Sequence, residues 1–96
     1  MLHFEWDPAK AATNLLKHSV SFAEAVTVLL DPLSLTDEDP THPTEIRWLT
    51  VGTSFRARIL VVVHTDDDDT VRIISARKAT AGERRNYEEG HEDEEG

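Results

Sequence analysis

The stretch RILVVVH, residues 58–64, decides the fold. Five of its seven side chains are aliphatic, and three consecutive ones are valine. A run so apolar and β-branched is typical of a strand that is covered on both faces. We therefore predict that it is the central strand of a sheet.

Shorter strand patterns lie on either side of this run. Glu45–Val51 precedes it, and Val71–Arg77 follows it across four consecutive aspartates, residues 66–69, which mark a hairpin turn. Leu33–Thr36 is a candidate edge strand, followed by a polar loop at 37–44 that contains two prolines. These segments predict an antiparallel sheet of three to four strands.

The N-terminal third of the chain has helical patterns. After a short strand candidate at Leu2–Glu5, Asp7 and Pro8 are the residue types preferred at an N-cap and at the first helical position. Its narrow apolar stripe should consist of Ala12, Leu15 and Leu16. The helix should end with a basic pair, Lys17 and His18.

Two capping boxes predict two more helices. Ser21 and Glu24 open the first, which buries one face and ends before Asp31-Pro32. Thr80 and Glu83 open the second, which should run to about residue 89. The buried face of the first consists of Phe22, Ala25, Val26 and Leu29.

Strands that are separate from helices indicate an α+β fold, with a short N-terminal strand and an αα-hairpin packed on the antiparallel sheet, and a short C-terminal helix. We expect one domain at residues 1–89. Residues 90–96, GHEDEEG, lack large apolar side chains and should form an acidic disordered tail.

The composition excludes several functional classes. The chain has no cysteine, so disulfides and thiolate chemistry are excluded, and no apolar run approaches the roughly 20 residues that span a membrane. The N-terminus lacks the pattern of a signal peptide, so a cytoplasmic protein is expected.

The segment RIISARKATAGERRNY, residues 72–87, holds five of the ten basic residues and one acid, in a chain of formal charge −9. Ten of the nineteen acids lie in the aspartate run and after residue 87, so the remaining chain is close to neutral. Guanidinium groups match phosphate in shape and charge, so RNA is a natural ligand.

Two long blocks, FEWDPAKAATNLLKHSVSFAEAVTVLLDPL at 4–33 and RIISARKATAGERRNYEE at 72–89, resemble the BrnT family of ribonuclease toxins from type II toxin–antitoxin modules. The resemblance implies a RelE-like fold and an endoribonuclease that inhibits translation. It also implies a BrnA-like ribbon-helix-helix antitoxin in a heterotetramer. Ser19 departs from the family, which usually has glycine there, so it should either adopt a strained left-handed conformation or reshape the turn.

Metal-free RNA cleavage by the 2′-hydroxyl needs a base, an acid and cations around the phosphorane. RelE-like nucleases use arginines and lysines for these roles. Arg77 is our first catalytic candidate, because Val71, Ile73, Ser75 and Arg77 should share one sheet face that ends beside a helix N-terminus. The alternative for Arg77 is a salt bridge to Glu83. The further catalytic candidates are Lys17, His18 and Arg58.

The candidates for RNA binding are Lys78, Arg84, Arg85, Tyr87 and His64. Each has a structural alternative. The basic residues could be ordinary surface charge, Tyr87 could be a packing residue, and His64 could be a structural residue at a strand end. Lys17 and His18 could merely complement the helix dipole.

No metal site and no cofactor are predicted. The five histidines, at 3, 18, 42, 64 and 91, have no metal-ligand spacing, and the glycines form no phosphate-binding motif. The competing hypothesis is a non-catalytic RNA- or protein-binding module that retains the fold.

Overall fold

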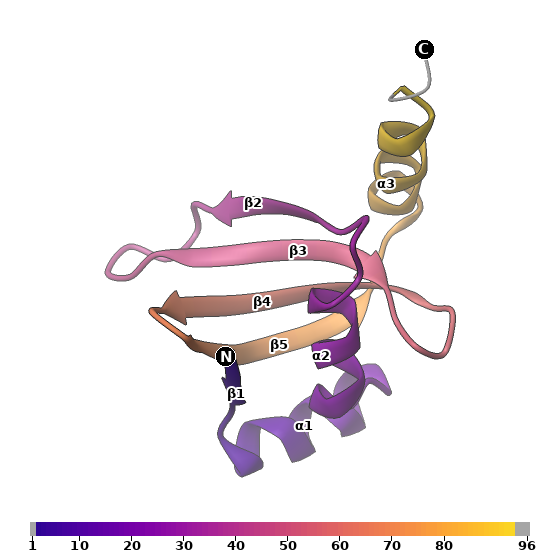
Figure 1. Cartoon of the computed structure of the whole chain (residues 1–96). Coiled ribbons are helices and arrows are strands. Elements are labelled where there is room, and N and C mark those ends of the chain that lie inside the picture. Colours follow the sequence, from indigo (N-terminus) through magenta and orange to yellow (C-terminus); the bar gives the residue numbers. More distant parts are fainter. Residues whose placement is uncertain (1, 94–96) are drawn as a thin grey trace.

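The computed structural model of this chain describes residues 2–93. Five strands and three helices follow one another in the order shown in Figure 1. Their bounds are β1 His3–Glu5, α1 Pro8–His18, α2 Phe22–Leu29, β2 Leu35–Asp39, β3 Arg47–Thr53, β4 Ile59–Asp67, β5 Thr70–Lys78 and α3 Ala81–Asp93.

The strands form one sheet in the order β1-β5-β4-β3-β2, with β4 in the middle. The predicted central strand is thus confirmed, and Val61 and Val62 on its two faces are both fully buried. The α+β class is also confirmed, and β2 to β5 form the predicted antiparallel sheet of four strands. The sheet has five strands and is mixed, because β1 pairs with β5 in parallel.

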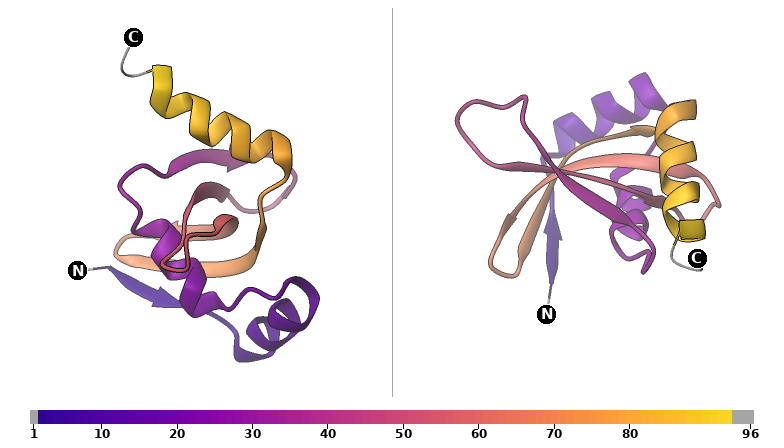
Figure 2. Two further views of the ribbon diagram at one scale, coloured as in Figure 1. Left: turned by 90° about the vertical axis from the view of Figure 1, so that its right-hand side faces the viewer. Right: turned by 90° about the horizontal axis from the view of Figure 1, so that it is seen from above.

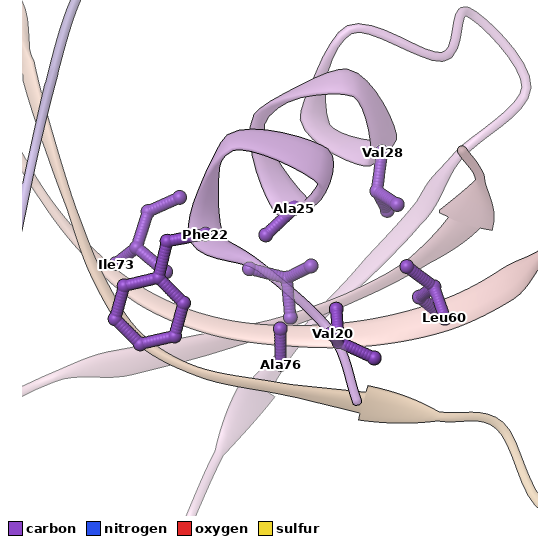
Figure 3. Close-up of a cluster of buried hydrophobic side chains, with 8 residues drawn as sticks. Val20, Phe22, Ala25, Val28, Leu60, Ile73 and Ala76 are labelled. Carbon is purple, nitrogen blue, oxygen red and sulfur yellow. The ribbon is translucent and has the colours of Figure 1, made fainter. Parts of the chain in front are cut away.

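The main core lies between α2 and one face of the sheet (Figure 3). Phe22, Ala25 and Val28 of α2 pack on aliphatic side chains of β4 and β5. The helical period of α2 therefore buries the face that the sequence predicted. The sheet residues in this cluster are Leu60, Val62, Ile73 and Ala76.

A β-bulge in β5 changes which residues share a face. His64 pairs with Ile73, whereas Val63 pairs with Ser75, so Ile74 is the extra residue. Ile73 and Ala76 consequently both face the core, which strict alternation forbids. The predicted row is therefore wrong, because beyond the bulge Ser75 and Arg77 lie on the opposite face from Ile73.

Asn14 of α1 protects the free edge of β5. Beyond the three residues paired with β1, this edge has no partner strand in the described chain. The Asn14 side-chain amide donates to the carbonyl of Ala76 at 2.8 Å and accepts from its N–H at 3.1 Å, so it replaces a neighbouring peptide group. The same amide donates to the carbonyl of Val20 at 2.9 Å.

This contact fixes the rotation of α1, and the rotation differs from our expectation. Asn14 is the buried residue of the helix, whereas Leu15 is 51% exposed and Leu16 is 88% exposed. The predicted apolar stripe of Ala12, Leu15 and Leu16 therefore faces solvent. Hydrogen bonding of the exposed edge of β5 takes precedence here over burial of the two leucine side chains, because a peptide group that is buried without a partner costs about 1–3 kcal/mol.

The turn between α1 and α2 follows the sequence closely. Asp7 caps α1 through its side chain, and Ser19 has a φ of 59°, in the predicted left-handed conformation. Ser21 caps α2 by accepting from the N–H of Glu24 at 3.0 Å. The second half of this capping box is absent, since the Glu24 carboxylate is bound elsewhere, as described below.

The C-terminal helix α3 leaves the end of the sheet and projects away from α1 (Figure 2). Its capping box is complete, with Glu83 N–H donating to Thr80 Oγ1 and Thr80 N–H donating to Glu83 Oε1. The helix reaches Asp93, beyond the expected end at Glu89 and into the segment expected to be disordered. Residues 94–96 of that predicted tail lie outside the described residues.

The edge strand β2 begins and ends later than predicted, and it takes up the first part of the expected polar loop. No described helix has the length and apolar character needed to cross a membrane.

We predict that Asn14→Leu lowers the free energy of unfolding by about 2–4 kcal/mol, since the N–H and C=O of Ala76 lose their partner in the interior. Urea denaturation at equilibrium measures this loss. Thr13→Leu on the exposed side of the same helix is the control and should change stability by less than about 0.5 kcal/mol. Equal effects of the two substitutions would contradict this role of Asn14.

Candidate functional site: two cationic hollows at the α1–α2 turn

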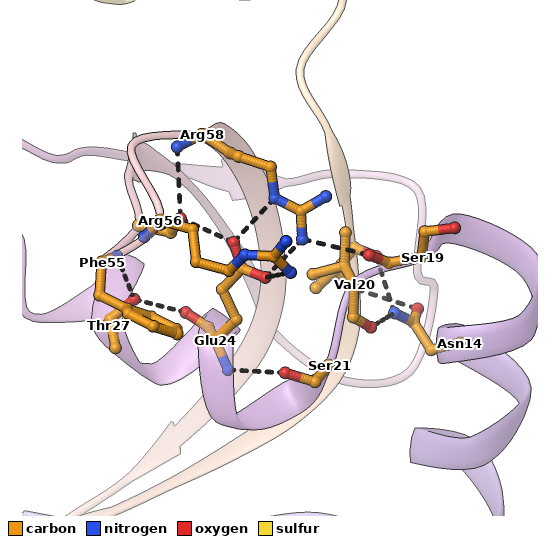
Figure 4. Close-up of polar contacts among 11 residues, drawn as sticks. Asn14, Ser19, Val20, Ser21, Glu24, Thr27, Phe55, Arg56 and Arg58 are labelled. Atoms are coloured by element: carbon orange, nitrogen blue, oxygen red, sulfur yellow. Dashed lines mark hydrogen bonds and ion pairs between the residues drawn. The ribbon is translucent and has the colours of Figure 1, made fainter.

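Glu24 is a buried carboxylate, 2% exposed, that binds Arg58 (Figure 4). Its Oε2 accepts from Arg58 Nε at 2.9 Å and from Ser54 Oγ at 2.7 Å, and its Oε1 accepts from Arg58 Nη2. The hydrogen bonds from Arg58 lower the pKa of Glu24, and they outweigh the opposing effect of burial. Glu24 is therefore held ionised in the interior.

Arg58 also ties this pair to the end of α1. Its Nη2 donates to the carbonyl of Ser19 at 3.1 Å, directly after the last helical residue, His18. A cation at this position offsets the negative end of the helix dipole. One guanidinium thus joins α2, the β3–β4 turn and the α1–α2 turn.

Arg58, Lys78 and Arg84 line one hollow, which we call the Arg58 pocket. The N–H of Ala79 donates to the carbonyl of Ile59 at 3.0 Å, which holds the end of β5 against the start of β4. Lys78 and Arg84 are exposed and make no ion pair with any side chain that the structure describes. The remaining lining is Ala57, Ile59 and Ala79, so no acid competes for an anion there.

A second hollow, the α1 groove, follows the edge of β5. Lys17 is exposed and His18 is half-buried, and both line it with α1 residues nearer the N-terminus. The rest of the lining comes from α1 and β5. It includes Lys10, Thr13 and Asn14 of α1 and Ile74 and Ser75 of β5. Ser19 follows the groove residue His18, and its carbonyl accepts from Arg58 of the pocket, so this hydrogen bond connects the linings of the two hollows.

Arg77 lines neither hollow. It faces the opposite side of the sheet from Lys78 and donates from Nη1 and Nη2 to the two carboxylate oxygens of Glu83, at 2.7 and 2.9 Å. The hydrogen bond from Arg77 is the largest of the effects that lower the pKa of Glu83 to about 2. The structure thus places our first catalytic candidate in the salt bridge that the sequence offered as its alternative.

Tyr87 and His64 are both in the interior. The Tyr87 hydroxyl contacts Asp31 at 2.7 Å and Thr53 at 3.0 Å, and burial is the main cause that raises its pKa. His64 is 5% exposed and contacts Thr50 and Asp66 through its two ring nitrogens. A direct contact of either side chain with RNA would require it to leave this position.

Arg85 is exposed on α3 and, like Lys78, makes no ion pair with a described side chain. It lines neither the Arg58 pocket nor the α1 groove.

Sequence reasoning missed Asn14 and Lys10. A signal for Asn14 was present, since it lies three residues after Ala11 and four before His18, in the helical row that faces the sheet. Lys10 had no distinguishing signal, because a lysine on a helix is usually a solvated residue.

Taken together, the features define a small α+β protein with two cation-lined hollows that are linked by the hydrogen bond from Arg58 to Ser19, a site suited to a polyanion. A family model described as "Ribonuclease toxin, BrnT, of type II toxin-antitoxin system" matches residues 6–83. The chain belongs to this BrnT family, for which RNA is the substrate and an antitoxin is the partner.

The solved structures agree on the fold. The crystal structure of the Brucella abortus ribonuclease toxin BrnT matches with a TM-score of 0.62 and 24% sequence identity. The match covers 83% of this chain and 99% of that one. No curated protein sequence matches this chain.

The Glu24–Arg58 pair should respond asymmetrically to substitution. Arg58→Met leaves Glu24 charged and almost fully buried, which should cost about 3–4 kcal/mol of unfolding free energy. Glu24→Gln leaves Arg58, whose side chain is 23% exposed, partly solvated and should cost about 1–2 kcal/mol. Urea denaturation measures both.

The double variant Glu24→Gln/Arg58→Met is the control for this comparison. It should be more stable than Arg58→Met alone, because no buried charge remains unpaired; Arg56, which lies 3.8 Å from Glu24, has a side chain that is 60% exposed and stays solvated. The buried-charge explanation is wrong if the double variant is less stable than both single ones.

Glu83 should make stability depend on acid pH. Its folded-state pKa of about 2 lies below the usual 4.5, so its contribution is present above pH 4.5 and is lost as pH falls toward 2. Because Arg77 is 37% exposed, we expect a contribution of only about 1–2 kcal/mol. Glu83→Gln should remove this contribution, so the free energy of unfolding, measured from pH 5 to 2.5, should fall less steeply with pH than in the unmodified chain. An unchanged pH dependence would contradict the assignment.

Proposed function

We propose that this chain is a cytoplasmic, metal-independent endoribonuclease that cleaves RNA by attack of the 2′-hydroxyl and thereby inhibits translation. The observation that carries the proposal is the hydrogen bond from Arg58, which lines the Arg58 pocket, to the carbonyl of Ser19, the residue that follows His18 of the α1 groove. Five candidate residues from the sequence, Lys17, His18, Arg58, Lys78 and Arg84, line these two hollows.

The Arg58 pocket supplies the charge that a phosphate needs. Glu24 neutralises Arg58, but Lys78 and Arg84 keep their charges available. Two cations at one phosphate stabilise the dianionic phosphorane more than the monoanionic diester, which is the condition for catalysis rather than binding alone.

The α1 groove supplies candidates for proton transfer. His18 carries an imidazole, which can accept or donate a proton, and its half-buried position limits competition from water. Lys17 is exposed beside it and can bind a phosphate of the neighbouring nucleotide. In this arrangement RNA lies across the α1–α2 turn, with one phosphate in the pocket and the next along the groove.

Arg77 takes a different role in the proposal. Its bidentate pair with Glu83 holds the first turn of α3, and this turn carries Arg84. Direct catalysis by Arg77 requires exchange of Glu83 for the substrate phosphate. Arg77→Ala should therefore affect stability as well as cleavage.

The antitoxin in this proposal is a BrnA-like ribbon-helix-helix protein that forms a heterotetramer with two toxins. A segment of it that covers Lys78 and Arg84 would exclude RNA from the pocket. Its side chains there should be acidic, because the pocket contains no acid of its own.

Cleavage of labelled single-stranded RNA in EDTA tests the catalytic proposal. His18→Ala should lower the cleavage rate by about 10²–10⁴-fold with little change in RNA affinity. Lys78→Ala/Arg84→Ala should weaken binding and reduce the salt dependence of log K by about 0.7 for each lost phosphate contact. Arg47→Ala, a cation paired with Glu45 outside both hollows, is the control.

The second candidate function is a non-catalytic RNA- or protein-binding module. It is favoured by one observation, that two of the four catalytic candidates, Arg58 and Arg77, are already paired with carboxylates. RNA binding without cleavage by the unmodified chain, with and without added metal ions, would decide for this module.

A further inference from the structure

A third hollow lies at the opposite end of β5 from the Arg58 pocket. It opens beside the turn between β4 and β5. Lys78 lies at the other end of β5, eight residues after Thr70, which corresponds to roughly 26 Å in an extended strand. Its apolar lining consists of Leu2, directly before β1, together with Phe4 of β1, Leu29 of α2 and Val71 of β5. We call it the aspartate-rimmed pocket.

The floor of this pocket is polar but satisfied. In its neutral form His64 donates from Nδ1 to Asp66, 2.7 Å away, and accepts at Nε2 from the hydroxyl of Thr50, 2.8 Å away. Thr36 lies 2.7 Å from Thr50 and continues the chain of hydrogen bonds. A ligand therefore finds no unpaired buried donor here and must bind through its apolar surface and through the rim.

The rim is acidic. Asp66 and Asp68 line it, within the run of four aspartates, and no lysine or arginine lines the pocket. None of the four carboxylates has a lysine or arginine partner among the described side chains. Like charges so close repel one another, and a bound cation relieves this repulsion. RNA is excluded for the same reason.

The pocket is small and has an exposed apolar border. Its volume of about 240 Å³ lies below the roughly 300–1,000 Å³ of usual small-molecule sites. Leu2 at its mouth is 53% exposed. This size suits one apolar side chain of a longer ligand rather than a nucleotide or a cofactor.

An open sheet edge lies beside the pocket. β1 is the edge strand, and its residue Phe4 lines the hollow. An extended peptide can add to such an edge through main-chain hydrogen bonds while alternate side chains enter the adjoining pocket.

We propose that the aspartate-rimmed pocket docks an extended segment of a protein partner, with one apolar side chain inserted and lysine or arginine on either side of it. The apolar side chain covers Leu2 and Phe4, and the flanking cations bind Asp67, Asp68 and Asp69. The assignment of this segment to the antitoxin rests on the proposed function, whereas binding of the segment does not. Docking here leaves both cationic hollows open to the rest of the partner.

The test uses the full chain and the acetylated, amidated pentapeptide GRLRG, followed by ¹H–¹⁵N NMR titration. We expect shifts at Phe4, Thr50, His64 and Val71, and none around Lys78 and Arg84. The peptides GRSRG and GELEG should bind at least about 5-fold more weakly, since one loses the apolar anchor and the other reverses the charge.

Two matched triple variants test the rim. Asp67→Asn/Asp68→Asn/Asp69→Asn keeps the bond between Asp66 and His64, and asparagine tolerates the φ of 51° at position 68. It should bind GRLRG at least about 5-fold more weakly. Asp37→Asn/Glu88→Gln/Glu89→Gln removes the same charge elsewhere and should bind as the unmodified chain does.

Equal weakening by both triple variants, or equal binding of GRSRG and GRLRG, would overturn the proposal, because each would show a general charge effect. Binding of free spermidine with the same shifts and affinity would overturn it too. RNA cleavage should be unchanged by the aspartate variant and by the peptide. A chain that binds GRLRG but cleaves no RNA would refute the proposed function and leave this docking site standing.

Discussion

The bond between Glu24 and Arg58 is the constraint on which the rest of the structure depends. A carboxylate that is 2% exposed is stable only when it is paired, and Arg58 and Ser54 pair it from the β3–β4 turn. Because Arg58 also binds the carbonyl of Ser19, the pair sets where α1 ends relative to the sheet. The same hydrogen bond connects the linings of the two cationic hollows, so one buried ion pair both stabilises the fold and positions the candidate site.

The second constraint is the exposed edge of β5. The bulge at Ile74 places Arg77 on the face away from the α2 core and Lys78 on the other face, the reverse of what strict alternation from Ile73 would give, and Asn14 holds α1 against the same strand. As a result, the basic residues of segment 72–87 have two different roles. Lys78 and Arg84 remain available to an anion, while Arg77 and Glu83 form an ion pair that orients α3. The charge of the segment is thus used partly for structure and partly for the site.

Charge is also separated along the sheet. The cations of the Arg58 pocket lie at the end of β5, those of the α1 groove lie beside its middle, and the aspartate run lies before its start. A chain with a net charge of −9 can therefore present a positive surface to RNA. The acidic end then suits a different kind of ligand from the basic end.

Much of the fold could be predicted from the sequence by itself: the central strand at 58–64, the caps at Asp7, Ser21 and Thr80, and the left-handed Ser19. Local backbone preference and side-chain periodicity determine these features, and both are encoded in neighbouring residues. Only the tertiary structure decided the face of Arg77, the burial of Asn14 and the pairing of Arg58. Each depends on a bulge, a strand edge or a carboxylate supplied by residues distant in the chain, and no local pattern reports the need to satisfy a buried polar group.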